Sequence, residues 1–237
     1  WANWRLVLPG LAEDRRVVAP DVVGFGYTTS RDGGVPDLDA WLDHVRTFLD
    51  VHGIRRASLV GNSFGGALAL WFAVTHPDRV SRLVLMGSVG APFELTPGLD
   101  AVWGYEPSVE AMEELLEIFV HDRSLLPANL AELRHRASTK PGAQERWAAL
   151  FPEPRQRWID RLVVPAEALA RLEAPTLLFH GREDRVIPLS SSLHLEHQIG
   201  DARLLVLPHT GHWVQVERAA EFTGHVRRFL AEGDDHP

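Results

Sequence analysis

Short, almost wholly apolar runs alternate along much of the chain with longer stretches whose apolar spacing is typical of helices. The short runs cover residues 16–19, 57–61, 82–86, 176–180 and 203–207. Runs of this length and composition predict strands that are buried on both faces. The longer stretches, which predict helices, cover residues 38–52, 64–76, 190–198 and 218–232. Strands that alternate with helices predict an α/β fold, a mainly parallel sheet with helices on both faces.

Between residues 91 and 170 the strand pattern stops and only helical patterns remain. The clearest helix is expected over residues 108–122, where Ser108 can act as the N-cap. We predict that residues 91–170 form a helical cap over the carboxyl edge of the sheet. Residues 1–90 and 171–237 would then form the core into which this cap is inserted, and the cap would not fold alone.

The composition excludes several classes of protein. A chain of 237 residues is long enough for one α/β domain with an insertion. The formal net charge of −8, from 32 acidic and 24 basic residues, argues against a nucleic acid partner. The absence of cysteine excludes a disulfide scaffold, a thiolate metal site and a cysteine nucleophile. No apolar run reaches the roughly 18 residues of a membrane span and no signal-peptide pattern opens the chain, so we expect no membrane partner and a cytoplasmic location.

The strongest chemical signal is the run Ser58-Leu59-Val60-Gly61-Asn62-Ser63-Phe64-Gly65-Gly66. It places the pattern G-x-S-x-G between a predicted buried strand and a predicted helix, the context in which a nucleophilic serine sits on a sharp strand-to-helix turn. The glycines permit the close backbone approach that such a turn needs. Ser63 is therefore the expected nucleophile. Because the N-terminus of the following helix faces the oxyanion that forms, the N–H of Phe64 is an expected oxyanion donor.

A serine hydroxyl also needs a histidine base that a carboxylate holds in the right orientation. The loop after the fourth predicted strand contains Glu183 and Asp184, and the loop after the fifth contains His209 and His212. Both loops follow the carboxyl edge of the predicted sheet, in the chain order serine, acid, histidine that this type of site requires. Among the other histidines, His180 is expected to be buried and hydrogen-bonded. No H-E-x-x-H or other ligand pattern is present, so no metal is predicted.

Six segments carry a resemblance to a known family: residues 19–28, 61–66, 85–90, 96–105, 154–158 and 180–188. In these segments the chain closely resembles the meta-cleavage product hydrolases, enzymes of the α/β-hydrolase fold that cleave carbon–carbon bonds in aromatic hydrocarbon catabolism. The branch it resembles most is that of the 2-hydroxymuconate-semialdehyde and 2-hydroxy-6-oxo-hepta-2,4-dienoate hydrolases. The matches at 96–105 and 154–158 matter most, because the core motifs alone would fit many α/β-hydrolases.

The resemblance implies hydrolysis of a 2-hydroxy-6-oxo-hexa-2,4-dienoate to 2-hydroxypenta-2,4-dienoate and a small acid such as formate or acetate. It implies no cofactor. It favours Asp184 over Glu183 as the acid and His212 over His209 as the base, because each matches the family motif. Family members are commonly dimers or larger, so a homo-oligomer is expected.

Further substrate-binding residues follow from the same resemblance. The substrate carries a carboxylate, and burying that charge requires a cation. Arg134 matches the family's cap arginine for this task, with Arg136 as its rival. The residues expected at the polar end of the site are Asn62 and Trp213. A small apolar pocket for the acyl side of the substrate is expected to be lined by Trp103, Ile159 and Val186. Ordinary core packing explains each of these residues nearly as well.

Two other functions fit the same residues. A carboxylesterase uses the same triad, since a fold does not determine the substrate. A catalytically inactive ligand-binding homologue would keep the cap. Dehalogenases and epoxide hydrolases of this fold have aspartate at the position of Ser63 and are excluded by the serine.

In the resembled family the chain continues upstream of Ala2-Asn3-Trp4 with a strand and a His-Gly-rich loop that supplies a second oxyanion N–H. We therefore expect the chain to be N-terminally truncated, with the first strands of the sheet missing. We also expect it to be inactive or poorly folded without an extension, because strands at the centre of the sheet would expose unpaired backbone.

Overall fold

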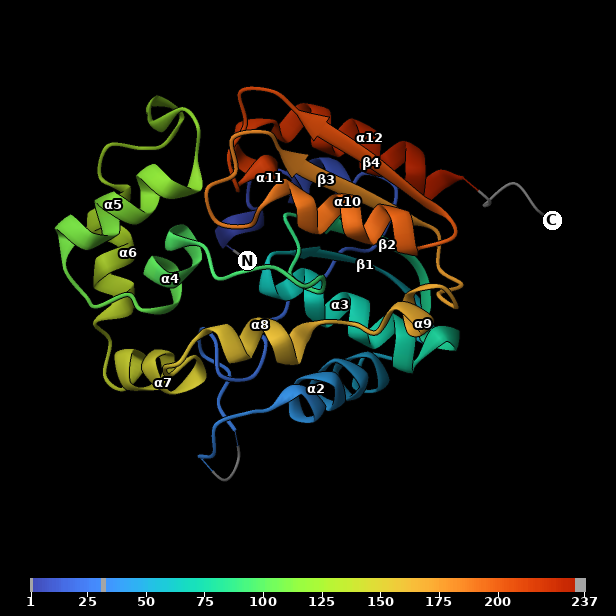
Figure 1. Cartoon of the computed structure of the whole chain (residues 1–237), viewed down its shortest axis with the longest axis horizontal. Helices are drawn as coiled ribbons and strands as arrows, with labels where there is room; N and C mark the ends of the chain where they lie inside the picture. Colours follow the sequence, from blue (N-terminus) through green and yellow to red (C-terminus); the bar gives the residue numbers. More distant parts are fainter. Residues whose placement is uncertain (1, 31–32, 233–237) are drawn as a thin grey trace.

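The strands of the computed structural model, which describes residues 2–30 and 33–232, form one parallel sheet (Figure 1). They follow one another in the sheet in chain order: β1 (Ala57–Asn62), β2 (Val80–Met86), β3 (Thr176–Gly181) and β4 (Ala202–Leu207). Each neighbouring pair is parallel, and the register places Leu85 of β2 between Gly61 and Leu178. Because all the strands run the same way, their carboxyl ends meet at one edge, and the loops that follow them are neighbours.

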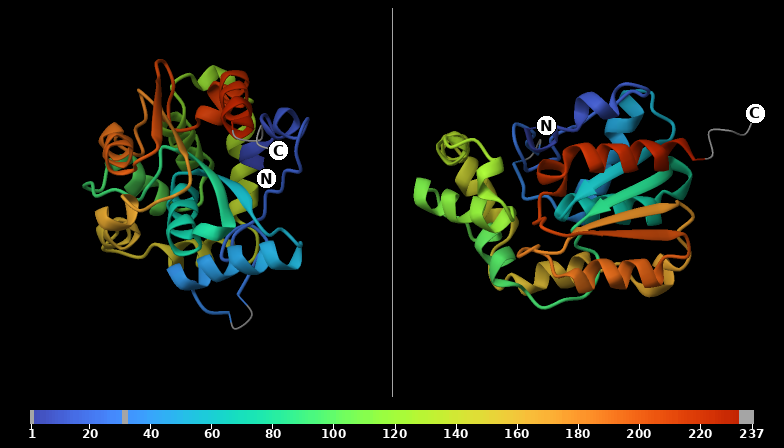
Figure 2. Two further views of the ribbon diagram at one scale, coloured as in Figure 1. Left: turned by 90° about the vertical axis from the view of Figure 1, so that its right-hand side faces the viewer. Right: turned by 90° about the horizontal axis from the view of Figure 1, so that it is seen from above.

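Helices cover both faces of this sheet (Figures 1 and 2). One face carries α2 (Leu38–Val51), α3 (Phe64–Thr75) and α10 (Leu189–Gln198), and the other carries α1 (Leu8–Leu11) and α12 (Ala219–Ala231). The first group packs against Leu83, Leu85 and Leu178, and the second against Val84, Met86 and Phe179. Successive strand residues point to opposite faces, so the continuous apolar runs supply both cores. The predicted α/β fold class is confirmed.

Residues 91–170, here called the helical segment, connect β2 to β3 and contain helices only. These are α4 (Pro97–Trp103), α5 (Val109–Phe119), η3 (Arg123–Leu125), α6 (Leu130–Ser138), α7 (Ala143–Leu150), α8 (Gln156–Leu162) and α9 (Ala166–Leu169). Ser108 is the N-cap of α5, as predicted, since its side chain accepts a hydrogen bond from the N–H of Ala111 at 2.9 Å. In Figure 1, α4 to α7 lie together to one side of the core, and α8 lies nearer to α3.

The helical segment contacts the loops that follow the carboxyl ends of the strands. The Thr96 hydroxyl donates a hydrogen bond of 2.6 Å to the carbonyl of Val186, in the loop after β3. The N–H of Trp213, in the loop after β4, donates to the carbonyl of Phe119 at 3.0 Å. The segment is therefore in direct contact with the edge at which the predicted catalytic residues lie.

The strand predicted over residues 16–19 is wrong, because residues 16–20 have no regular secondary structure. A strand needs a neighbour with which to exchange backbone hydrogen bonds. Among the described residues, β1 has such a neighbour on one side only, namely β2. Val17 instead packs beside Val7 and Leu11 in the apolar core under α1 and α12. The other predicted strands are confirmed.

The helix predicted over residues 218–232 is confirmed as α12. A separate short helix, α11 (Val214–Glu217), precedes it, and Arg218 lies between the two outside helical geometry, at φ −126° and ψ 37°. The remaining elements are the short turns η1 (Ala2–Trp4) and η2 (Pro77–Arg79). Within residues 2–30 and 33–232, no helix combines the length and the apolar character that crossing a membrane would require.

Candidate active site

Ser63 occupies a strained turn between β1 and α3. Its backbone has φ 55° and ψ −122°, values that a residue with a side chain rarely adopts. The turn is held by the Ser63 N–H, which donates 2.9 Å to the carbonyl of Met86 on β2. It also depends on glycine, because a β-carbon on Gly61 would lie 2.6 Å from the Cα of Gly66. The local backbone therefore has the geometry that a nucleophilic serine requires.

Asp184 and His212 form a buried hydrogen-bonded pair. The Nδ1 of His212 lies 2.8 Å from Oδ2 of Asp184, and the two side chains are 2% and 1% exposed. The other carboxylate oxygen, Oδ1, accepts the N–H groups of Val186 and Ile187 at 2.8 and 3.0 Å. This arrangement holds the carboxylate in one orientation and directs His212 by its Nδ1, so that Nε2 is the nitrogen left for proton transfer.

The environment of Asp184 favours its charged form. Burial by itself raises the pKa of this carboxyl group, but the nearby charge and hydrogen bond of His212 act against it. The nearby ring of His180 and the N–H of Ile187 act in the same direction, and the pKa of Asp184 lies below its ordinary value. Asp184 is therefore an anion at neutral pH, as a carboxylate that orients a histidine must be.

Gly87, directly after β2, brings the serine turn and the acid–histidine pair together. A β-carbon on Gly87 would lie 2.8 Å from Oδ2 of Asp184 and 3.0 Å from Nδ1 of His212. Asn62, directly before Ser63, donates from its side chain to the carbonyls of Met86 at 3.1 Å and His212 at 3.5 Å. Ser63, Asp184 and His212 thus lie at one edge of the sheet, and Asn62 ties the serine turn to the histidine loop.

Glu183 and His209, the two alternatives from the sequence, lie elsewhere. The carboxylate of Glu183 accepts a hydrogen bond from the N–H of Thr210 at 2.9 Å. This bond is the main reason that the pKa of Glu183 lies below its ordinary value. The His209 ring lies against His121, with ring centroids 5.6 Å apart. The structure therefore pairs Asp184 with His212 and gives Glu183 and His209 other partners.

His180 is buried and hydrogen-bonded as predicted, but its position behind the acid was not predicted. Its Nδ1 lies 2.8 Å from the Ser192 hydroxyl and its Nε2 lies 3.1 Å from the carbonyl of Ile187. A carbonyl only accepts, so Nε2 carries the proton and Nδ1 accepts from Ser192. The same Nε2 lies 3.7 Å from Oδ2 of Asp184. Burial lowers the pKa of His180, which keeps the ring neutral.

Phe64, the predicted oxyanion donor, is the first residue of α3. Its ring packs against those of Trp41 and Phe151, at centroid distances of 4.8 and 5.6 Å. The same apolar cluster contains the three residues predicted for the acyl side, namely Trp103, Ile159 and Val186, which are 3%, 0% and 1% exposed. They come from α4, α8 and the loop after β3 and meet beside the serine turn, although their burial is also that of an ordinary core.

Arg134, on α6, lies over the face of Trp213, with its guanidinium carbon 4.6 Å from the ring centroid. It also donates to the side-chain oxygen of Asn3. Among the described residues no carboxylate forms an ion pair with it. Burial, together with the charge of Arg5, lowers the pKa of Arg134 to about 10. The structure thus brings Arg134 and Trp213 together, whereas the rival Arg136 is exposed.

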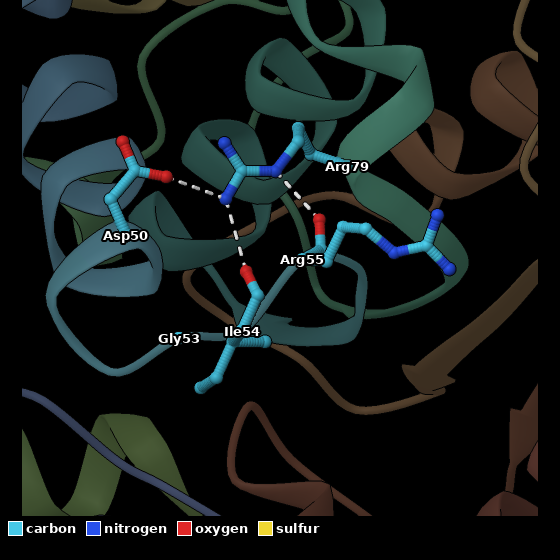
Figure 3. A pocket seen from close by; sticks show the side chains of 5 residues that line it. All are labelled: Asp50, Gly53, Ile54, Arg55 and Arg79. Atoms are coloured by element: carbon cyan, nitrogen blue, oxygen red, sulfur yellow. Dashed lines mark hydrogen bonds and ion pairs between the residues drawn. The ribbon is translucent and has the colours of Figure 1, made fainter.

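Two surface hollows differ in their relation to the site. One is lined by His121, Glu183, Asp184 and Arg185 and so borders the acid. The other lies at the start of β1, away from the described site (Figure 3). There Arg79 donates to the Asp50 carboxylate and to the carbonyls of Ile54 and Arg55, contacts that fix the chain between α2 and β1.

Within the residues that the structure describes, no group of three or more histidine, aspartate or glutamate side chains is placed to hold a metal ion.

Comparison with known proteins extends this picture. The model of the alpha/beta hydrolase family matches residues 1–224. The 2-hydroxymuconate semialdehyde hydrolase of Pseudomonas sp. (strain CF600) is 53% identical over 234 residues, covering 99% of this chain and 83% of the relative. The 2-hydroxy-6-oxo-2,4-heptadienoate hydrolase of Pseudomonas putida (strain F1) is 52% identical over 234 residues, covering 99% and 85%.

Solved structures agree with these sequence matches. A meta-cleavage product hydrolase from Pseudomonas fluorescens IP01 superposes with a TM-score of 0.95 and 49% identity, covering 98% of this chain and 85% of that one. The 2-hydroxy-6-oxo-6-phenylhexa-2,4-dienoate hydrolase from Rhodococcus sp. strain RHA1 has a TM-score of 0.87 at 33% identity, covering 98% and 84%. The chain is therefore more similar to the first of these two enzymes than to the phenyl-product hydrolase.

Proposed function

The chain belongs to the alpha/beta hydrolase family and, within it, to the meta-cleavage product hydrolases, and from this membership we propose its substrate and the role of each site residue. The substrate is a 2-hydroxy-6-oxo-hexa-2,4-dienoate with a small group at C6. Water cleaves the bond between C5 and C6, and the products are 2-hydroxypenta-2,4-dienoate and a small carboxylic acid.

The pair formed by Asp184 and His212 at 2.8 Å, at the same sheet edge as the strained Ser63 turn, is the observation that supports this reaction. The dienol first becomes its keto tautomer. His212 then takes the proton of the Ser63 hydroxyl, whose oxygen bonds to the C6 carbonyl carbon, and Asp184 stabilises the imidazolium that forms. The N–H of Phe64 stabilises the oxyanion. The carbon–carbon bond breaks because the leaving group is a stabilised dienolate, which takes up the proton from His212 and leaves the acyl group on Ser63. A water molecule that His212 deprotonates then attacks this acyl group, which releases the small acid and restores the Ser63 hydroxyl.

Arg134 binds the carboxylate of the dienoate in this proposal. Its guanidinium has no carboxylate partner among the described residues, and although burial lowers its pKa to about 10, it still carries its charge at neutral pH, so an anionic ligand would supply the counter-charge. Asn62 and Trp213 line the polar end of the site. Arg134→Leu should weaken productive binding of the dienoate by about 2–5 kcal/mol, the usual cost of leaving a buried charge unpaired.

A neutral p-nitrophenyl ester, which has no carboxylate, is the comparison substrate for Arg134→Leu, and Arg136→Leu on the same helix is the control variant. The loss should be confined to the dienoate and to Arg134. Equal losses on both substrates would show that Arg134 serves the structure of the helical segment instead. Ester hydrolysis without dienoate turnover in the unchanged chain would make the protein a carboxylesterase.

Trp103, Ile159 and Val186 define the acyl side of the site in this proposal. We take this side to accept a small apolar group at C6, because two relatives that are 53% and 52% identical are the 2-hydroxymuconate semialdehyde and 2-hydroxy-6-oxo-2,4-heptadienoate hydrolases. Ring-fission products with hydrogen, methyl or ethyl at C6 should therefore give a higher kcat/KM than the phenyl compound. The dienoates absorb strongly, so an absorbance assay with these four substrates tests the preference, and a higher value for phenyl would contradict it.

The proposal extends to the organisation of the protein. Residues 91–170 act as a cap inserted into a core formed by residues 1–90 and 171–237. A homo-oligomeric state remains a prediction drawn from the family, and a cytoplasmic location remains a prediction drawn from the sequence. Size-exclusion chromatography with light scattering tests the first of them.

A further inference from the structure

Glu217, at the end of α11, joins the histidine loop to the helical segment. Its Oε2 accepts a hydrogen bond of 2.6 Å from the N–H of Gly211, the residue before His212. Its Oε1 accepts the N–H groups of His121 and Asp122 at 2.8 and 3.0 Å, directly after the end of α5. One carboxylate therefore connects two segments that are far apart in the sequence, and one of them carries the proposed base.

Other contacts at the same junction involve the last turn of α5 and the histidine loop. The ring of Phe119 stacks on Trp213 at a centroid distance of 4.4 Å and lies over His212 at 6.1 Å. The N–H of Trp213 donates to the carbonyl of Phe119 at 3.0 Å. The two backbones are so close that a β-carbon on Gly211 would lie 2.8 Å from the nitrogen of His121. Figure 1 shows α11 on the side of the core that faces α5.

The chemistry of this junction calls for a carboxylate. Hydrogen bonds from N–H groups to an ionised acceptor are shorter and stronger than neutral ones, and an ionised glutamate has acceptor positions on both oxygens. Glutamine has nearly the same shape, but its NH2 group would face one of the N–H donors and leave it without an acceptor. Replacing Glu217 by glutamine thus removes the polar contacts on one side of the junction while preserving its volume.

We propose that Glu217 is a positioning residue that fixes the separation between the end of α5 and the loop of His212, so that the helical segment determines where the base lies. The proposal rests on the role of His212 given under the proposed function. Arg134 belongs to the same junction because it lies over Trp213. Binding of the substrate carboxylate at Arg134 and placement of His212 are thereby coupled through Trp213, Phe119 and Glu217.

The test is Glu217→Gln in the whole chain, with Glu221→Gln as the matched control, since Glu221 is a surface glutamate beside Arg218. On 2-hydroxy-6-oxo-hepta-2,4-dienoate, Glu217→Gln should lower kcat by about 10- to 100-fold, the usual effect of a small misplacement of a reacting group. The downfield NMR signal of the His212 Nδ1 proton, which reports the bond to Asp184, should shift or broaden. Glu221→Gln should change neither quantity.

Hydrolysis of p-nitrophenyl acetate separates this proposal from the proposed substrate, because that reaction needs the base but no dienoate. If the unchanged chain does not cleave the dienoate, the substrate proposal fails, and the slower ester hydrolysis of Glu217→Gln still tests the positioning role. Gly211→Ala, which should force the same two backbones apart, is expected to reproduce the lower kcat and the altered NMR signal.

Three results would overturn the positioning role. One is a kcat within twofold of the unchanged chain together with an unaltered NMR signal in Glu217→Gln. The second is a loss of thermal stability with normal kinetics below the melting temperature. The third applies even if neither variant folds: hydrogen exchange of the unchanged chain should show slow exchange at His121, Asp122 and Gly211 together, and rapid, independent exchange there would contradict the junction.

Discussion

The two halves of the candidate site are held in place by different means. Ser63 is held mainly by residues that are next to it in the sequence, in a turn whose strained backbone is set by the strand before it and the helix after it. His212 is held by side chains and backbone from four other places in the sequence, namely Asn62, Phe119, Asp184 and Glu217. The nucleophile thus depends on local geometry, and the base depends on the assembly of distant segments.

The forces also differ between the halves. Around Ser63 the constraint is steric, because a β-carbon on Gly61 would meet the backbone of the next turn and one on Gly66 would meet the side chain of Ser88. Around His212 the constraint is electrostatic, since a buried carboxylate keeps its charge only through the hydrogen bonds and charges directed at it. Substitutions in the first half should therefore act on packing, and substitutions in the second should act on charge and pH dependence.

Ser63→Ala should have the largest effect on activity and leave the turn itself nearly unchanged. Removing the nucleophile of a triad costs on the order of 10⁶-fold in kcat, whereas binding energy from the rest of the site remains. We expect the dienoate to bind with near-normal affinity, measured by the change in its absorbance on titration, and to turn over at a greatly reduced rate. Undiminished turnover would remove Ser63 from the mechanism.

Asp184→Asn should have the next largest effect and act only on the histidine half. The amide keeps the size of the side chain, but it favours the wrong tautomer of His212, a change that costs about 10⁴-fold in kcat in related triads. Circular dichroism should show an intact fold at neutral pH. Glu183→Asn is the control, because Glu183 bonds to Thr210 instead of the histidine. A loss of the same size in the control would reopen the choice between the two acids.

The same contrast explains what the sequence could predict. The Ser63 turn was predictable because strand, turn and helix are adjacent in the chain, and β1 and α3 lie where the pattern predicts them. For acid and base the sequence narrowed the choice to two residues each, and the family resemblance selected Asp184 and His212. Only the meeting of the loops after β3 and β4 shows which side chains pair.

Features that depend on distant partners escaped prediction. Residues 16–19 have the composition of a strand, but pairing depends on a neighbour that composition does not reveal. The same holds for Glu217, whose acidic side chain on a helix reads as an ordinary surface residue until the chain folds and brings His121 and Asp122 to it. The contact of His180 with the acid was likewise visible only in the structure.

Gly61→Ala tests the steric constraint around Ser63 by its effect on the free energy of unfolding. The added methyl group would meet the backbone of Gly65 and Gly66, and overpacking of this kind costs about 1–3 kcal/mol, occasionally more. Gly65→Ala is the matched control in the same motif, because a β-carbon there has no neighbour within 4 Å and lies in a helix. The control should be neutral or stabilising by about 0.4–1 kcal/mol. Urea unfolding of the two variants measures both effects, and equal stabilities would contradict the steric account.

His180→Gln tests the electrostatic constraint around Asp184 and His212 by its effect on the pH dependence of the free energy of unfolding. It should have the smallest effect of the four substitutions. Burial is the main reason that the pKa of His180 is lowered, and the nearby His212 lowers it further. The charge of Asp184 and the hydrogen bond to Ile187 raise it, but they do not outweigh burial. In the unfolded chain a histidine has a pKa of about 6.5. Because the pKa of His180 in the folded protein lies below its value in the unfolded chain, the contribution of His180 to stability is fully present above about pH 6.5. This contribution is lost as the pH falls from there through the lower pKa of the folded protein. One such group changes the free energy of unfolding by at most about 1.4 kcal/mol per pH unit.

We therefore expect urea unfolding between about pH 7 and pH 5 to show a smaller loss of stability in His180→Gln than in the unchanged chain. The exposed His197 on α10 supplies the control variant, His197→Gln, which should keep the original pH dependence. Asp184 does not confuse this measurement. Its lowered pKa makes its contribution present above the ordinary value of about 3.9, and that contribution is lost only as the pH falls further. Parallel pH profiles for His180→Gln and the unchanged chain would show that the ring behind the acid takes up its proton as freely in the folded protein as in the unfolded one.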